Sequence, residues 1–144
     1  EVPEEMYEVP IGKANIVREG KDLTILAIGR MVHEAVAAVA PLKELGIDAE
    51  VIDVRSIQPF DSDTAIASLR KTHRGLIIHE AVRFGGFGGE IVAQLQEQAF
   101  DYLDAPIARV GAPFSPVPFS PALEKVYIPN ADSIVAEVRK TLGM

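Results

Sequence analysis

An apolar run that leads through a loop and a glycine-rich turn into a helical pattern is the feature that most limits how this chain can fold. Residues 76–78 are apolar and β-branched at two of their three positions, which is typical of a strand. Glycines occupy positions 85, 86, 88 and 89, and apolar residues then recur at helical spacing: Ile91, Val92, Leu95 and Ala99. In an open α/β sheet, ligands or partners gather after the carboxyl end of a strand, so this turn is a candidate functional site.

Strand-like and helix-like segments alternate along the rest of the chain. Strands are expected at residues 14–17, 23–28, 49–54, 75–79 and 107–110. Helices are expected before Gly46, after Asp61, after the glycines and after Asn130, and Pro41 should kink or restart the first of them. This order predicts an α/β fold, with a parallel sheet covered by helices on both faces. A short turn at residues 19–22 joins the first two strands, so the first strand should run antiparallel, because parallel strands need a long crossover.

Length and composition exclude several classes of protein. The 144 residues suffice for one domain, and the net charge of −7 argues against a nucleic-acid partner, which would need a basic face. Without cysteine there is no disulfide framework and no thiolate metal site, and no run of 18 apolar residues suits a membrane. We expect a soluble, intracellular protein. Residues 1–10 are acidic, hold two prolines and do not begin with methionine, so they are expected to be a linker from a missing N-terminal domain, with the folded domain at 11–144.

Three interpretations of the glycine-rich turn compete. A phosphate cradle is disfavoured, because Ile91 stands where the dinucleotide fingerprint needs glycine or alanine, and Glu90 would repel a phosphate. A second interpretation is a tight turn with close packing of helix on sheet. In the third, bare backbone at Gly86 and Gly88 approaches another protein domain beside two apolar anchors. This third interpretation predicts a subunit interface at Phe84, Gly86, Phe87 and Gly88.

No complete catalytic constellation is visible in the sequence. Metal-ligand spacing is absent among the three histidines, His33, His73 and His79. His79 and Glu80, at the expected end of a strand, are positioned like an acid/base couple. A structural or interface role is favoured for both, because no nucleophile or oxyanion donor set lies nearby in sequence. Asp53 and Arg55, two residues apart on one strand face, predict a local ion pair or a hydrogen bond to the neighbouring strand.

A proline-rich segment at residues 113–121 is the second unusual loop. It contains two P-x-x-P patterns, which can act as a ligand for an SH3-type domain. Its two phenylalanines favour an ordered loop that is packed on something. Both unusual loops therefore hold phenylalanines that need cover, and this combination predicts a domain whose work is assembly.

Four segments together resemble the E1 β subunits of 2-oxo acid dehydrogenase complexes. Residues 49–61 are similar to the family segment E-V-I-D-L-R-T-I-x-P-x-D. Residues 79–81 followed by 85–91 resemble the next signature, and residues 103–110 resemble the L-[DE]-A-P-[IV]-x-R-V that comes after it. Ile128-Pro129 matches near the end. Order and spacing agree from Ile11 to Met144, so the resemblance covers nearly the whole chain.

The resemblance implies the C-terminal, transketolase-like domain of a thiamine-diphosphate-dependent E1 β subunit. Such enzymes decarboxylate a 2-oxo acid and reductively acylate the lipoyl group of E2. The implied fold is a three-layer α/β/α domain with a mostly parallel five-stranded sheet and one antiparallel edge strand. In that family thiamine diphosphate and magnesium are bound by the α subunit and the β N-terminal domain. No catalytic, cofactor-binding or metal-binding residue is therefore expected in this chain, and the domain alone should be inactive.

The implied partners are an E1 α subunit, a second E1 β subunit and the subunit-binding domain of E2. Asp104 matches the acidic position of the L-[DE]-A-P motif, and with the terminal carboxylate at Met144 it is expected to dock the basic E2 domain. The expected location is the cytoplasm of a bacterium, or the mitochondrial matrix in a eukaryote. The substrate stays open between branched-chain 2-oxo acids, pyruvate and acetoin. The alternatives are another transketolase-type enzyme, such as a deoxyxylulose-phosphate synthase, and a free-standing flavodoxin-like binding module.

Overall fold

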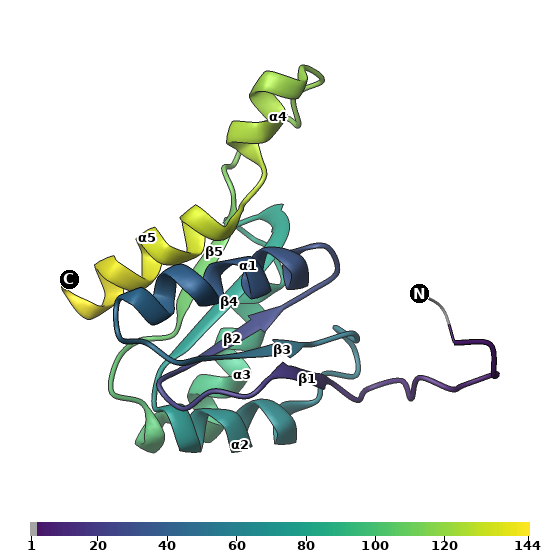
Figure 1. The fold of residues 1–144 in the computed structure, drawn as a ribbon, viewed down its shortest axis with the longest axis vertical. Helices are drawn as coiled ribbons and strands as arrows, with labels where there is room; N and C mark the ends of the chain where they lie inside the picture. Colours follow the sequence, from purple (N-terminus) through teal and green to yellow (C-terminus); the bar gives the residue numbers. More distant parts are fainter. Residues whose placement is uncertain (1–2) are drawn as a thin grey trace.

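A five-stranded sheet forms the centre of the molecule, for which a computed structural model describes residues 3–144 (Figure 1). Its strands are β1 (Asn15–Arg18), β2 (Leu23–Ala27), β3 (Ala49–Asp53), β4 (Gly75–Val82) and β5 (Ala108–Ala112). The spatial order is β1-β3-β2-β4-β5. All neighbouring strands are parallel except β1, which pairs antiparallel with β3 at the edge of the sheet. The predicted α/β class and the antiparallel edge strand are confirmed.

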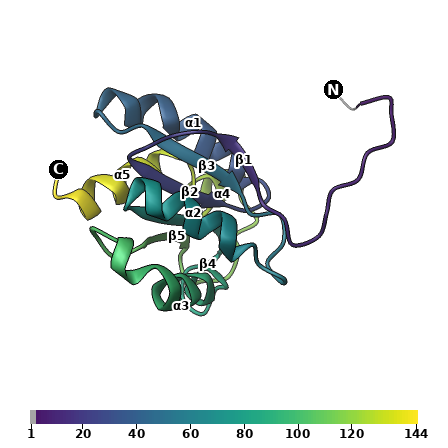
Figure 2. The same cartoon turned by 90° about the horizontal axis from the view of Figure 1, so that it is seen from below.

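Helices cover both faces of the sheet, as the predicted three-layer architecture requires (Figures 1 and 2). One face holds α1 (Met31–Glu44) and α5 (Ala131–Leu142), and the other holds α2 (Ser62–Thr72) and α3 (Gly88–Ala99), which ends in the 3₁₀ turn η1 (Phe100–Tyr102). The short helix α4 (Pro121–Tyr127) covers neither face and stands off the body beyond the end of the sheet (Figure 1). Within residues 3–144, no helix is long and apolar enough to cross a membrane.

Two apolar cores hold the three layers together. Successive strand residues point to opposite faces, so Ile25 and Ile78 enter the core under α1 and α5, whereas Leu26 and Ile77 enter the core under α2 and α3. Each of these side chains is almost fully buried, a gain of roughly 1.5–3 kcal/mol per side chain over leaving it exposed. A sheet buried on both faces is the normal state of parallel strands, and it brings the carboxyl ends of β2, β3 and β4 to one edge.

The element boundaries follow local signals for the most part. Asp61 caps α2 as predicted, because its carboxylate accepts a hydrogen bond from the Thr64 amide at 3.3 Å. Asn130 forms a capping box with Ser133 at the start of α5. Pro41 does not restart the first helix, since α1 continues through it to Glu44. The helix is held on both sides of Pro41 by residues that are buried in the core under α1 and α5, Ala38 and Leu42.

Two details of the strands differ from the predictions, and one had been left open. The neighbour of β1, which the sequence left open, is β3. β4 continues past His79 to Val82, because it pairs with β5 as far as Ala112. β3 ends at Asp53, and Arg55 has a positive φ of 58°, so the two residues do not share a strand face. The local ion pair predicted for them is confirmed, with Arg55 Nε at 3.8 Å from Asp53 Oδ2.

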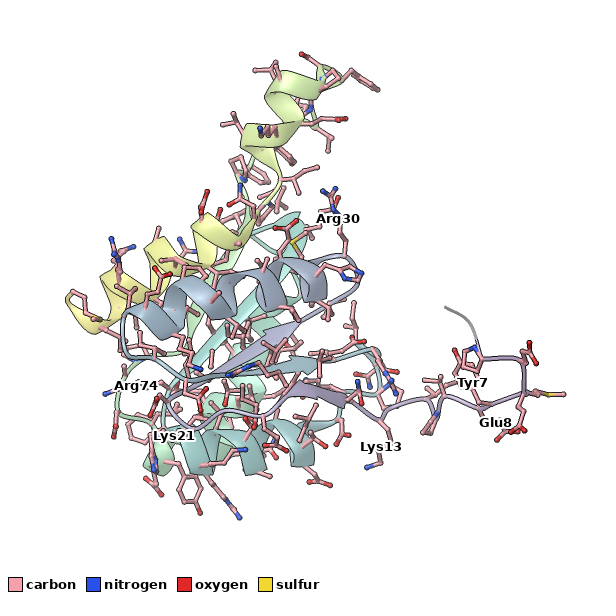
Figure 3. All side chains as sticks on the ribbon, in the orientation of Figure 1. Tyr7, Glu8, Lys13, Lys21, Arg30 and Arg74 are labelled. Atoms are coloured by element: carbon pink, nitrogen blue, oxygen red, sulfur yellow. The ribbon has the colours of Figure 1, made fainter. Side chains whose placement is uncertain are left out.

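The N-terminal segment leaves the body of the molecule. Residues 3–10 form neither helix nor strand and are exposed, and Figure 3 shows Tyr7 and Glu8 well away from the sheet. The chain is fastened from Gly12 onward: the Gly12 amide donates to Ser56 Oγ at 2.9 Å. Residues 1–2 of the predicted linker lie outside the described residues, and the division into a linker at 1–10 and a domain at 11–144 stays a prediction.

Candidate functional site

The glycine-rich turn closes over the side chain of His79, which is 1% exposed. A β-carbon at Gly88 would lie 2.5 Å from His79 Nε2, and one at Gly86 would lie 2.8 Å from His79 Cε1. On the neighbouring strand, a β-carbon at Gly111 would lie 3.0 Å from the same Cε1. Carbon atoms normally keep about 3.5–4.0 Å from non-bonded atoms, so a side chain at any of these positions would displace the imidazole. The domain's own core therefore needs the bare backbone at Gly86 and Gly88.

Burial keeps the His79 ring neutral. Its Nδ1 lies 3.0 Å from the carbonyl oxygen of Ala81, and since a carbonyl only accepts, Nδ1 holds the proton. Nε2 is then unprotonated, and it is buried without a hydrogen-bond partner among the described residues. Burial lowers the pKa of His79; the hydrogen bond to Ala81 opposes this, and the positive charge of Arg109 adds to it. Phe87 covers the ring, with the two ring centroids 4.5 Å apart.

The structure does not bring His79 and Glu80 together as an acid/base couple. They are consecutive on β4, so their side chains point to opposite faces, and Glu80 is exposed while His79 is sealed. A general base needs hydrogen-bond reach to its substrate, and the His79 Nε2 has no open path to one in this chain. The burial of His79 agrees with a structural role, one of the two roles favoured from sequence, and the assignment stays a prediction.

Phe84 lies on the surface beside the turn. It is 73% exposed, and its ring meets Phe114 edge to face at 5.0 Å between centroids. These two rings line an open groove of about 550 Å³ together with Arg83, Arg109, Gly111, Ala112 and Pro113. Of the predicted interface residues, Phe84 thus faces outward, whereas Gly86, Phe87 and Gly88 each have a neighbour inside the domain. Their assignment to a subunit interface stays a prediction.

The proline-rich segment contacts the body of its own domain at its base, where Phe114 meets Phe84, and what the rest of the loop packs on stays a prediction. Residues 113–127, which we call the arm, comprise the proline-rich loop and α4. No residue of α4 is buried, and Phe119, at the far end of the arm, is 99% exposed. The prolines keep the loop extended and unable to fold back as a strand or a helix. The arm leaves the body as a projection (Figure 1).

Asp104 and Met144 lie at the amino end of the parallel strands, away from the glycine-rich turn. Both are exposed, and their backbone amides are held by the domain: Asp104 N donates to the His73 carbonyl and Met144 N to the Arg139 carbonyl, each at 2.9 Å. A small pocket between the two segments is lined by residues of both, Ala105, Pro106, Thr141 and Leu142 among them. The two predicted docking residues are thus fixed at the same end of the molecule.

The two other histidines lie at the ends of helices. His33 is exposed in the first turn of α1. His73 is the residue after the end of α2, where it has a positive φ of 59°. Its Nδ1 lies 2.8 Å from the Tyr102 carbonyl oxygen, so this histidine ties the end of α2 to η1.

A buried polar network under α2 was missed in the sequence. Glu50 is completely buried and accepts hydrogen bonds from Ser68 Oγ and Lys71 Nζ. Ser68 continues the network to Thr24 Oγ1 at 2.5 Å, which lies 2.6 Å from Thr72 Oγ1. The available signal was a carboxylate at an inward position of an apolar strand, opposite a polar i, i+4 stripe on α2. Since all the partners are internal, the network fastens α2 to the sheet.

The residues present do not fit thiamine diphosphate or magnesium. Across residues 3–144, no group of three or more His, Cys, Asp or Glu side chains could hold a metal ion. A phosphate cradle would need open backbone, but the glycine-rich turn faces His79. The first turn of α3 also carries the acidic Glu90, which would repel a phosphate. The described part of this chain therefore offers no place for the cofactor's diphosphate.

These features define a class: a three-layer α/β domain with a sealed histidine, a projecting arm and no assembled catalytic group in its described residues. The family model "Transketolase, C-terminal domain" matches residues 12–134, and the chain belongs to this family.

Similar proteins include β subunits of two kinds of dehydrogenase. The β subunit of acetoin:2,6-dichlorophenolindophenol oxidoreductase from Bacillus subtilis (strain 168) is 49% identical over 99% of this chain and 42% of its own length. The β subunit of the pyruvate dehydrogenase E1 component from Staphylococcus epidermidis (strain ATCC 35984) is 45% identical over 99% of this chain and 43% of its own length. The predicted kinship with E1 β subunits is confirmed, and the chain spans less than half the length of these relatives.

Solved structures agree with the fold. A structure described as "Split gene transketolase, inactive beta4 tetramer" superposes with a TM-score of 0.81 at 31% identity, covering 99% of this chain and 45% of its own. A transketolase mutant from Pichia stipitis superposes with a TM-score of 0.60 at 19% identity over 91% of this chain and 18% of its own. The second likeness concerns the fold alone.

Proposed function

We propose that this chain is the C-terminal domain of the E1 β subunit of a thiamine-diphosphate-dependent dehydrogenase of the 2-oxo acid or acetoin type. In the whole enzyme the substrate is oxidatively cleaved and its acyl group passes to the lipoyl group of E2, and this domain contributes subunit assembly and E2 docking. The 49% identity to an acetoin oxidoreductase β subunit, over 99% of the chain, is the observation on which the proposal rests. The exposed Phe84 and the projecting arm support the assembly role.

Thiamine diphosphate and magnesium belong to other parts of the proposed enzyme. When bound there, the cofactor supplies the carbanion chemistry that a 2-oxo acid needs. We expect this domain's residues to hold no part of it, an expectation that the filled turn supports, so the 144-residue chain alone should have no activity. The partners are then an E1 α subunit, a second E1 β subunit and the E2 subunit-binding domain, in the cytoplasm of a bacterium like those of the relatives.

A chimeric β subunit tests the proposal directly. The homologous 42% of the Bacillus subtilis acetoin oxidoreductase β subunit is replaced by this chain, and the chimera is produced with its α subunit. We expect reduction of 2,6-dichlorophenolindophenol with acetoin, dependent on added thiamine diphosphate. The matched control has the same replacement with Leu95→Asp, which puts a charge in the core under α2 and α3 and should abolish assembly. A well-folded chimera without assembly or activity would contradict the proposal.

The docking role is tested at the amino end of the strands. Asp104→Lys in the assembled chimera should weaken binding of the basic E2 subunit-binding domain at least about tenfold, or roughly 1.4 kcal/mol, and leave acetoin oxidation unchanged. Asp63→Lys, at another exposed carboxylate on α2, is the control. Exposed charges are screened beyond about 8 Å at physiological ionic strength, so the affinity should also fall with salt. Equal affinity for both variants removes Asp104 from the docking site.

A split transketolase is the second candidate, because the structural neighbour at 31% identity and a TM-score of 0.81 is one. A second chimera, in which this chain replaces the matching part of a split transketolase, separates the two candidates. Transfer of a two-carbon ketol unit by that chimera would favour the second candidate over the first.

A further inference from the structure

A set of contacts fastens the chain at the point where the N-terminal segment joins the body. Residues 3–10 are exposed and belong to no helix or strand, and β1 begins only at Asn15. Between them, residues 12–14 contact the loop that joins β3 to α2, at residues 54–61. We call these contacts the clasp. They come before the first strand, so the pairing of β1 with β3 does not account for them.

The clasp attaches three successive residues of the chain. The Gly12 amide donates to Ser56 Oγ at 2.9 Å, and the Ala14 amide donates to Asp61 Oδ2 at 3.0 Å. Lys13 Nζ lies 3.8 Å from Asp61 Oδ1, and Figure 3 shows Lys13 where the segment meets the body. The Lys13 side chain is mostly exposed, so the two amide hydrogen bonds are the firmer attachments. With several attachments in a row, the chain cannot pivot about a single contact.

A turn at Gly12 sets the direction in which the chain leaves the body. Gly12 has a φ of 76°, in the left-handed region that favours glycine. A β-carbon there would lie 2.8 Å from Cγ of the Pro59 ring, so the clasp needs glycine for space as well. The preceding residue, Ile11, is exposed, and the segment before it runs away from the sheet (Figures 1 and 3). The exposed segment therefore starts from a turn that is held in one conformation.

Asp61 serves the clasp in addition to the helix cap. Its carboxylate is buried and accepts hydrogen bonds from the Thr64 amide at the start of α2 and from the Ala14 amide. Burial alone would raise the pKa of Asp61, but the hydrogen bonds from Ala14 and Thr64 and the charge of Lys13 bring it below its ordinary value. A cap needs one acceptor oxygen, and an ionised carboxylate has two. The second oxygen of Asp61 therefore ties residues 12–14 to the start of α2.

We propose that the clasp is a positioning device: Gly12, Ser56 and Asp61 fix the direction in which the chain leaves this domain, and thereby the orientation of the domain against the preceding part of the subunit. The inference rests on the proposed function, because it needs a longer β subunit. This chain matches 42% of the length of the similar acetoin oxidoreductase subunit. Placement of the rest matters for turnover, since a misplacement of about 1 Å far from the chemistry can cost roughly 100-fold in rate.

Spin labels in the 144-residue chain test the clasp itself. The chain has no cysteine, so Ile11→Cys and Lys140→Cys place one label beside Gly12 and the other on the exposed face of α5. Pulsed electron spin resonance should give a narrow distribution of distances between the labels. Ser56→Ala combined with Asp61→Asn should widen it at least about twofold, because residues that lose their contacts fray with the segment before them. Asparagine has only one acceptor oxygen, so it cannot serve both the cap and the clasp.

The matched control is Ser62→Ala combined with Asp63→Asn, the same two exchanges in the first turn of α2, outside the clasp. Gly12→Ala breaks the clasp independently and leaves the cap of α2 intact, so it decides the matter if the Asp61→Asn variant does not fold. Distances that stay as narrow in the clasp variants as in the parent overturn the inference. Equal widening in the control overturns it as well.

Turnover of the chimera tests the positioning role. Ser56→Ala combined with Asp61→Asn should lower kcat for acetoin at least about tenfold per assembled enzyme. Ser56→Thr keeps the hydroxyl and should keep both the narrow distances and the activity. Widened distances with unchanged kcat overturn the positioning role. An inactive unaltered chimera contradicts the proposed function instead, and the label distances then still decide whether the clasp fixes the chain.

Discussion

The glycine-rich turn and the arm look alike in sequence but differ in where their contacts lie. Each combines phenylalanines with residues that bend or expose the backbone. In the turn, the space beside the glycines is filled from inside by the His79 imidazole and covered by Phe87. In the arm, Phe119 and the residues of α4 touch nothing that buries them. A glycine cluster therefore identifies a close approach of backbone to some group, while burial of that group shows whether it belongs to the same chain.

The largest expected effect tests the filled turn. Gly88→Val should destabilise the isolated chain by about 3 kcal/mol, because its β-carbon would meet His79 Nε2 at 2.5 Å and overpacking costs typically 1–3 kcal/mol before any backbone strain. Gly89→Val is the matched control one residue on. Its β-carbon would meet the flexible tip of Arg109 at 3.1 Å, so the loss there should stay below about 1 kcal/mol. Urea unfolding of both variants measures the difference.

A double mutant sharpens this result. If the imidazole is what Gly88 must avoid, the penalty of Gly88→Val should shrink by at least half when His79→Ala has already vacated the space. An unchanged penalty in the His79→Ala background would mean that another contact within the domain, such as the one with Ile77, sets the requirement for glycine.

Replacing phenylalanine by alanine in the glycine-rich turn and in the arm tests the next largest difference. Phe87→Ala should cost about 1–3 kcal/mol in the isolated chain, because its half-buried ring covers His79 and packs on the core under α2 and α3. Phe119→Ala should change stability by less than about 0.5 kcal/mol at concentrations where the chain is monomeric. Equal losses at the two positions would mean that the arm folds onto the body in solution, and the contrast between the two regions would disappear.

The sequence was sufficient for the layered fold because the fold follows from local patterns. Apolar runs, the cap at Asp61 and the capping residue Asn130 act within a few residues of themselves. The pairing of β1 with β3 could not be read in the same way, since it depends on which strand edge is free after the sheet has formed. The extension of β4 beyond His79 likewise depends on its neighbour β5.

The candidate site was less predictable, because its decisive contact joins distant residues. Nothing local shows that Gly111, on another strand, completes the cavity around His79. The network of Glu50 was missed for the same reason: its partners on α2 lie 18 and 21 residues away. The motifs resembling E1 β subunits identified the family, but they could not tell which of the glycines face inward.

The smallest expected effect is the pH dependence that His79 adds to stability. Burial lowers its pKa in the folded chain, whereas the unfolded chain takes up a proton near the ordinary value of about 6.5. The unfolded state therefore binds more protons below that pH, so stability falls as pH decreases and is fully present above it. Between pH 7 and pH 6 this group can contribute at most about 0.7 kcal/mol, since the proton uptake by the unfolded chain sets the limit.

Matched variants separate the contribution of His79 to the pH dependence of stability from the contributions of other residues. His79→Asn should flatten the stability profile between pH 7 and pH 6, because asparagine does not titrate, even though it lowers stability at every pH by losing the contact with Phe87. His33→Asn, at an exposed position in the first turn of α1, is the matched control for the loss of a histidine. A profile that keeps its slope without His79 would mean that the imidazole is already hydrated in solution. The turn would then be open to an outside partner after all, and it would resemble the arm in structure as well as in sequence.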